Sequence, residues 1–381
     1  MKPARRILGN FLNLSAGELA ARLVSFAAFA HLARALGSSE FGRIGFALTV
    51  VSYLQIPVLQ GFDSVGMRDV ARDRTLLLAY AGRILTMRLL AALFTWGALA
   101  AWVALQLPAW RVGSLLVYFG LVLFAQAASL KWVFQAVEQT RAVAVANILS
   151  QVVFAAGAFS VTSPEGSVRV ALWLLAGEAL GSLTLGALFV RRYGVPAPGL
   201  DRRLFRESAP LAASSALGTV LFNFDVLALA WFQAPAAVGL YTAVYKLVLL
   251  FSTPLTLFQH SLLPTLARAA ASDTPPRSSI ASRICPLPTL PRAAASDAPL
   301  APTAGPALRY LAIVFLPLPF AGLLFGPAVV KLVFGPEYAA GALPLVILLA
   351  SLPWMALRSL FRIILVSCDR QRLDLRAVLA G

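Results

Sequence analysis

The feature that most constrains this sequence is a series of ten mostly apolar stretches, each about 20 residues long, the length an α-helix needs to cross a bilayer. Hydrophobic residues make up 59% of the chain and charged residues 13%, whereas a soluble domain carries about twice that charge. The pattern predicts an all-α polytopic membrane protein. The expected spans are 10–34, 43–62, 84–107, 113–134, 143–162, 168–190, 209–232, 238–263, 308–333 and 342–366.

The formal net charge of +16 is distributed unevenly between the connections. The amino terminus, the alternate long connections and the carboxyl terminus together hold 22 Lys and Arg, whereas the opposite set of short turns holds four. Lys and Arg accumulate in cytoplasmic loops of membrane proteins. The bias therefore predicts a cytoplasmic amino terminus followed by an uncleaved first helix. It also explains the basic charge without nucleic acid as a partner.

Motifs for covalent chemistry are absent from the sequence. There is no G-x-x-x-x-G-K-[ST] phosphate loop, no H-E-x-x-H pair and no G-x-S-x-G elbow. The cysteines, Cys285 and Cys368, and the histidines, His31 and His260, are too few and too scattered to predict a metal site or a disulfide framework. Connections predicted to lie outside do not exceed about ten residues, so a membrane enzyme such as a sugar polymerase is disfavoured. We expect no catalytic residue, no metal and no cofactor.

Several ionisable residues fall inside the predicted spans, where each costs about 2.5–3.5 kcal/mol on insertion and usually faces a protein interior or a wet cavity. The bases outnumber the acids, so a cavity built from them would have a positive potential that suits a pyrophosphate head group. A cavity for cationic drugs would need the opposite sign. The candidate substrate contacts are Arg22, Lys246 and Arg358, and the supporting charges are Glu18, Glu178 and Asp225.

Some of these charges have a second interpretation. Glu18 and Arg22 lie four residues apart on one helical face and can neutralise each other instead of contacting a ligand. Asp225 can hold Lys246 in place or bind a cation. Arg88, near the start of its span, can reach the membrane surface instead of a cavity.

The region between the eighth and ninth spans differs from the rest of the chain. Residues 265–307 are rich in Pro, Ala and Ser and are predicted to form a disordered cytoplasmic linker. Residues 263–275 recur as 287–299 with changes only at Pro291 and Ala298, which indicates a local duplication without a function of its own. The last residues of the chain resemble the entry to another helix.

Several short motifs, in their order and spacing, resemble the polysaccharide (O-antigen) flippase family of the multidrug/oligosaccharidyl-lipid/polysaccharide exporter superfamily. Each motif alone is weak, but together they cover most of the chain outside about 270–305. The motifs lie at 36–42 (LGSSEFG), 132–138 (WVFQAVE), 205–211 (FRESAPL), 224–227 (FDVL), 238–241 (VGLY) and 334–338 (FGPEY).

The resemblance implies a two-lobed exporter-type helix bundle in the bacterial inner membrane. Residues 1–190 would form a first six-helix lobe, 191–264 helices 7 and 8 of the second lobe, and 308–381 helices 9 and 10 with the start of a truncated helix 11. The implied function is the flipping of undecaprenyl-pyrophosphate-linked oligosaccharide units by alternating access, with Lys246, Arg358 and Arg22 on the head group. Implied partners are the lipid-linked oligosaccharide, membrane lipids and the polysaccharide polymerase machinery.

Two alternatives remain open within this resemblance. One is a cation-coupled drug or metabolite antiporter of the same superfamily, which would need acids in the first lobe, where Glu18 and Glu178 are available. The other is an inactive truncated remnant, because a second lobe that ends after ten helices would have an exposed inner face.

Overall fold

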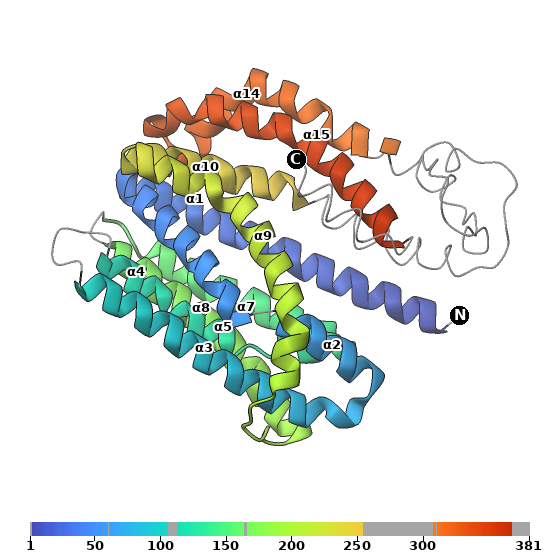
Figure 1. Ribbon diagram of the computed structural model, residues 1–381. Coiled ribbons are helices and arrows are strands. Elements are labelled where there is room, and N and C mark those ends of the chain that lie inside the picture. Colours follow the sequence, from blue (N-terminus) through green and yellow to red (C-terminus); the bar gives the residue numbers. More distant parts are fainter. Residues whose placement is uncertain are drawn as a thin grey trace, which may run out of the picture. The chain divides into compact units, whose positions relative to one another are not determined.

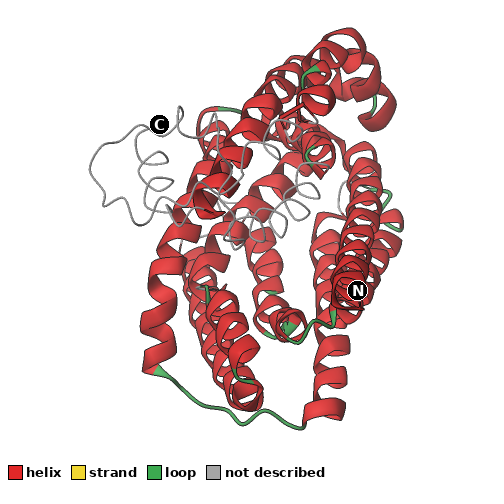
Figure 2. Cartoon of the chain, turned by 90° about the vertical axis from the view of Figure 1, so that its right-hand side faces the viewer, coloured by secondary structure: helices red, strands yellow, loops and turns green. Residues whose placement is uncertain are grey.

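The computed structural model describes residues 2–59, 61–105, 113–163, 166–253, 308–309 and 311–367, with side chains between 19 and 361 except Ser214. The predicted linker 265–307, the residues beyond 367 and the side chain of Glu18 lie outside this description. Helices account for nearly all of the described residues, and no strand is present among them (Figure 2). The described chain forms two compact units, Met1–Leu247 with Val330–Gly341, and Val248–Val329 with Ala342–Gly381.

The helices of the first unit follow the order of the predicted spans, although α1 joins the first two spans and the predicted span 113–134 is divided among α4, α5 and α6 (Figure 1). The bilayer core holds no water to hydrogen bond with backbone N–H and C=O groups. A spanning segment therefore forms a helix, in which these groups bond to each other. Their bounds are α1 (Lys2–Leu59), α2 (Phe62–Arg72), η1 (Arg74–Leu76), α3 (Leu77–Leu105), α4 (Gly113–Gly120), α5 (Val122–Ala127), α6 (Lys131–Ala136), α7 (Thr140–Phe159), α8 (Ser167–Tyr193), α9 (Arg202–Phe232) and α10 (Pro235–Phe251).

The remaining described elements are α14 (Pro317–Phe334), the short 3-10 helix η5 (Pro336–Gly341) and α15 (Ala342–Ser367). Within the second unit α14 and α15 pack closely, since a Cβ on Gly322 would lie 2.7 Å from Leu349. Among the described residues, eight helical stretches are long and apolar enough to cross a membrane, and α10 is a shorter apolar helix. The prediction of an all-α membrane protein is confirmed.

The first two predicted spans are joined in α1 by a kink. Gly37 interrupts the helix with φ 75° and ψ 170°, a backbone conformation that residues with a Cβ rarely adopt. The sequence predicted a short turn between the spans 10–34 and 43–62, and the structure has the single non-helical residue Gly37 in its place. The chain therefore changes direction without a loop whose polar backbone would need other partners.

Three of the short motifs converge around this kink in the first unit. The Ser38 amide and hydroxyl donate to Glu337 Oε1 at 2.9 and 2.5 Å. The Tyr338 hydroxyl donates to the carbonyl of Ala33 at 2.9 Å. Gly239 approaches so closely that a Cβ there would lie 1.9 Å from the Ser38 carbonyl oxygen. The motifs at 36–42, 238–241 and 334–338 thus form one contact region, which explains why Val330–Gly341 belongs to the first unit.

One predicted loop contains structure of its own. Part of the connection 63–83 forms α2, an amphipathic helix that begins after Gly61, where φ is 68°. Its apolar side, including Phe62, Val65 and Val70, is buried in a core with Trp132. Arg68 on its exposed side donates to Asp69 and to Glu207 of α9, both at 2.7 Å. Arg68 therefore connects α2 to the start of α9.

Candidate functional site

Close packing of α7 against α8 brings polar side chains together inside the first unit. A Cβ on Gly177 would lie 2.4 Å from the carbonyl oxygen of Ser150, and one on Gly181 would lie 2.0 Å from the Ser150 hydroxyl. Small residues allow helix backbones in membranes to approach in this way. The approach places Ser150 and Gln151 of α7 beside Glu178 of α8, facing α1.

These side chains line a cavity of about 270 Å³, which we call the charged chamber. Helices α1, α6, α7 and α8 contribute its walls. Its lining consists of Ala21, Arg22, Ser25, Lys131, Asn147, Ser150, Gln151 and Glu178.

The chamber has more positive than negative side chains. Arg22 and Lys131 are its basic residues, and Glu178 is its one acidic lining residue. The Lys131 ammonium lies 3.9 Å from Glu178 Oε2, which is an ion pair but longer than a hydrogen bond. Lys131 therefore keeps its hydrogen-bond donors available while its charge is partly balanced.

Neutral polar groups of the chamber have unused hydrogen-bonding capacity. Ser150 Oγ and Gln151 Oε1 are buried, and no described group of the protein hydrogen bonds to either atom. An unpaired buried polar atom costs about 1–3 kcal/mol. A polar ligand or water in the chamber would remove this penalty, so the lining suits a solvated, charged group rather than a lipid tail.

Lys246 on α10 contacts a different part of α1. Its Nζ lies 4.2 Å from the centroid of the Phe29 ring, a cation–π distance. Phe29 follows Arg22 by seven residues, which is two helical turns, so the two residues lie on the same face of α1. Lys246 is not a lining residue of the charged chamber, but it adds a second positive charge along the face of α1 that Arg22 occupies.

Asp225 on α9 has a partner other than Lys246. Its Oδ2 accepts a hydrogen bond from the Tyr241 hydroxyl, and its Oδ1 accepts one from the amide of Val226 at 2.8 Å. The Tyr241 and Tyr245 rings stack one turn apart, with centroids separated by 6.0 Å. The proposed contact between Asp225 and Lys246 is not formed in this structure.

The structure thus brings two of the predicted residues, Arg22 and Glu178, into one chamber. Arg358 is exposed on α15 in the second unit, and the side chain of Glu18 is not described. Arg88 is buried instead of reaching the surface, and its guanidinium pairs with Asp63 at 2.5 Å.

Sequence reasoning missed Lys131, Asn147 and Gln151. Lys131 lies within the expected span 113–134 but was not named as a candidate contact, and in the structure it begins α6 within the apolar stretch Gly113–Ala136. A lysine isolated between two apolar runs was the signal that could have placed it inside. Asn147 and Gln151 are four residues apart on α7, and this spacing of amides within an apolar span was a second available signal.

A search of solved structures finds transporters with a similar arrangement of helices. An inward-facing multidrug resistance MATE family transporter of the MOP superfamily aligns with a TM-score of 0.64 at 13% identity, over 94% of this chain and 83% of that chain. An outward-facing one aligns at 0.59 and 14%, over 99% and 84%. A MATE multidrug transporter in complex with R6G aligns at 0.63 and 14%, over 98% and 85%. At this identity the likeness shows the fold alone.

Comparison with curated proteins finds no match. The family model described as polysaccharide biosynthesis protein matches residues 7–270, which include the charged chamber and the motifs from 36 to 241. This chain is therefore a multi-pass membrane protein with the MATE transporter fold, and it belongs to the polysaccharide biosynthesis protein family.

Proposed function

We propose that the protein carries lipid-linked, anionic saccharides, specifically undecaprenyl-pyrophosphate-linked oligosaccharide units, across the bacterial inner membrane, and that it performs no covalent chemistry. The observation that supports the proposal most directly is the charged chamber, in which two basic side chains, one acid and several neutral polar groups lie among apolar helices. The amino terminus would face the cytoplasm, where the saccharide is loaded. Membrane lipids and the polymerase machinery would be its partners.

The charge balance of the first unit favours an anion as the transported group. Arg22 and Lys131 line the chamber and Lys246 lies against the same face of α1 as Arg22. Glu178, the acidic lining residue, is paired with Lys131. In a water-poor interior such bases attract a pyrophosphate strongly, because screening is weak. A cation-coupled drug antiporter would need an acid without a basic partner at this position.

Transport by alternating access would also use the contact region around Gly37. The hydrogen bonds from Ser38 to Glu337 and from Tyr338 to Ala33 join segments about 300 residues apart in the sequence. A few hydrogen bonds of this kind stabilise one arrangement by a few kcal/mol. Such a modest stabilisation would let a bound substrate shift the equilibrium to another arrangement.

The test is complementation of a strain that lacks its own flippase, using Arg22→Gln and Lys131→Gln. Each hydrogen bond between a charged side chain and a phosphate contributes about 1.5–3 kcal/mol, so each variant should weaken head-group binding by about 10- to 100-fold. We expect little surface polysaccharide and an accumulation of lipid-linked units in the cytoplasmic leaflet. Arg72→Gln, on the exposed side of α2, is the matched control and should complement fully.

Lys131→Arg tests whether the positive charge at this position is what transport requires. It keeps the charge beside Glu178 and should restore most of the activity that Lys131→Gln loses. Normal surface polysaccharide from Arg22→Gln and Lys131→Gln, in cells that contain the variants at wild-type levels, would rule out the chamber as the head-group site. Efflux of cationic drugs with no effect on surface polysaccharide would favour the antiporter instead.

A further inference from the structure

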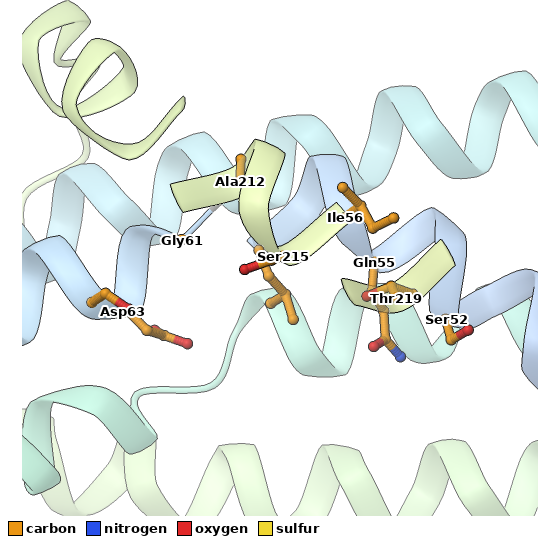
Figure 3. A pocket seen from close by; sticks show the side chains of 10 residues that line it. Ser52, Gln55, Ile56, Gly61, Asp63, Ala212, Ser215 and Thr219 are labelled. Atoms are coloured by element: carbon orange, nitrogen blue, oxygen red, sulfur yellow. The ribbon is translucent and has the colours of Figure 1, made fainter. Parts of the chain in front are cut away.

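A second cavity in the first unit has lining chemistry different from that of the charged chamber. It has a volume of about 260 Å³ and lies between α1, α2 and α9 (Figure 3). Its polar lining consists of hydroxyl, amide and carboxyl side chains and includes no base. These residues are Ser52, Gln55, Asp63, Ser64, Ser215 and Thr219. We call this cavity the hydroxyl pocket.

The helices that form the hydroxyl pocket are held together at specific contacts. Gly61 adopts φ 68° between α1 and α2, and a Cβ there would lie 2.7 Å from the Cβ of Leu211 on α9. The Tyr53 hydroxyl donates to the carbonyl of Val220 at 3.3 Å, further along the same pair of helices. The two contacts lie at the two ends of the α9 segment that lines the pocket, and they join α9 to α1 and to the turn that follows α1.

Several side chains of the pocket form no hydrogen bond with the described residues. The side chains of Gln55, Ser215 and Thr219 form no hydrogen bond within the described part of the chain. The Gln55 amide and the two hydroxyls can each both donate and accept a hydrogen bond. Ser52 donates to the carbonyl of Thr49 at 2.6 Å and keeps its lone pairs. The wall therefore offers donors and acceptors in similar number.

Asp63 is fixed at the pocket by a buried cation. Its Oδ1 lies 2.5 Å from Arg88 Nη2, and the exposed fractions of the two side chains are 44% for Asp63 and 2% for Arg88. The guanidinium thus neutralises the carboxylate from within the protein, while nearly half of the Asp63 side chain stays accessible. A carboxylate held in this way accepts hydrogen bonds from a ligand without attracting a free cation strongly.

Electrostatics and size define the class of ligand that this wall would recognise. An anion is disfavoured because the lining includes no basic side chain, and an alkyl chain is disfavoured by the uncompensated polar groups. A neutral, hydroxyl-rich molecule satisfies both donors and acceptors. The volume corresponds to about nine water molecules at ~30 Å³ each, which is room for about one sugar ring.

We propose that the hydroxyl pocket binds a sugar residue of the lipid-linked saccharide through its hydroxyl groups. The inference rests on the proposed function and divides recognition between two places, with the pyrophosphate in the charged chamber and a sugar in the hydroxyl pocket. The pocket lies where α1 ends and α2 begins, beside the basic connection that the charge count predicts to be cytoplasmic. A saccharide assembled in the cytoplasm would meet the protein at that end.

The experiment compares two probes with the purified full chain in detergent by native mass spectrometry. One probe is undecaprenyl pyrophosphate and the other is undecaprenyl-pyrophosphoryl N-acetylglucosamine. A hydrogen bond to a neutral group changes affinity by about fivefold. The wild type should therefore bind the sugar-bearing probe at least about tenfold more tightly than the sugar-free probe.

The pocket variant is Ser215→Ala/Thr219→Val, which removes two hydroxyls and keeps the side-chain shapes similar. It should lose about tenfold or more of the preference for the sugar-bearing probe, with unchanged affinity for undecaprenyl pyrophosphate. Ser160→Ala/Thr184→Val removes the same two groups elsewhere, where they bond to their own helices, and should keep the preference.

The outcomes separate the two proposals. A pocket variant that keeps the full preference, or a wild type without any preference, would overturn the hydroxyl pocket. The proposed function would still stand if both probes bind and Arg22→Gln weakens both. If the wild type binds neither probe, the proposed function fails, and the sugar site fails with it.

Discussion

The ion pair between Arg88 and Asp63 predicts an unequal response to removing either partner. The Arg88 side chain is 2% exposed and the Asp63 side chain 44% exposed, and their charged atoms lie 2.5 Å apart. Among the described residues, the guanidinium also donates a long hydrogen bond of 3.4 Å to the carbonyl of Ser129. Arg88 therefore depends on Asp63 for charge compensation, whereas water can compensate Asp63.

The magnitudes follow from this difference in burial. Asp63→Asn leaves a buried, uncompensated guanidinium, which costs about 3 kcal/mol, the lower end of the range for breaking a buried pair because Asp63 is half-exposed. Arg88→Met removes the buried charge and leaves a carboxylate that water can solvate, so we expect a loss of about 1 kcal/mol or less. The double variant should resemble Arg88→Met, because an apolar side chain then occupies the buried position.

The assay is thermal unfolding of the purified protein in detergent, followed by tryptophan fluorescence. At about 2–4 °C per kcal/mol for a unit of this size, Asp63→Asn should lower Tm by roughly 6–12 °C. Arg88→Met should lower it by at most about 4 °C, and adding Arg88→Met to Asp63→Asn should recover most of the loss. The control is Asp73→Asn, which removes a carboxylate that does not belong to this pair. Equal losses from Asp63→Asn and Arg88→Met, or no recovery in the double variant, would refute the reasoning.

Two further predictions concern packing and pH. Gly239→Ala should destabilise the protein by about 1–3 kcal/mol, because its Cβ would lie 1.9 Å from the Ser38 carbonyl oxygen. The control is Gly186→Ala, which has open space around its position and should be neutral or stabilising. Equal Tm values for the two variants would contradict the close contact at Gly239. The Arg68 guanidinium, hydrogen-bonded at 2.7 Å, holds the pKa of Asp69 below its usual range. A carboxylate whose pKa is lower in the folded than in the unfolded protein stabilises the fold at pH values above its unfolded pKa of about 3.9, and this stabilisation is lost as the pH falls through its folded pKa. The Tm difference between wild type and Asp69→Asn should therefore be constant from pH 7 to 5 and shrink below about pH 4. A difference that grows on acidification would show that the sign is wrong.

Much of the fold was predictable because membrane insertion is a local property. Each span needs only its own length and apolar composition to be recognised. The segments that became α7 and α8 were placed within about three residues, whereas α3 and α9 begin about seven residues before the predicted spans. The amphipathic helix α2 was missed, because its mixed composition resembles a polar connection. The apolar side of this helix is stabilised only by packing against the core around Trp132, which distant segments of the chain form.

The candidate sites were harder to predict because they depend on contacts between distant segments. Arg22 and Glu178 were recognised as interior charges from their positions in apolar spans. Lys131 was not among the predicted contacts, since only the packing of α6 against α7 shows that it lines the charged chamber. Nothing in the neighbourhood of Arg88 in the sequence identifies Asp63 as its partner.

The sequence by itself determined that this chain is a helical membrane protein with basic connections and an excess of positive interior charge. These properties follow from composition and spacing along one dimension. Only the tertiary structure decided which charges share a cavity, which hydroxyls lack partners, and that Gly37, Gly239 and Glu337 meet in one region. The physical reason is that helix packing depends on close approach at a few small residues and on long-range polar pairs, neither of which leaves a periodic signal in the sequence.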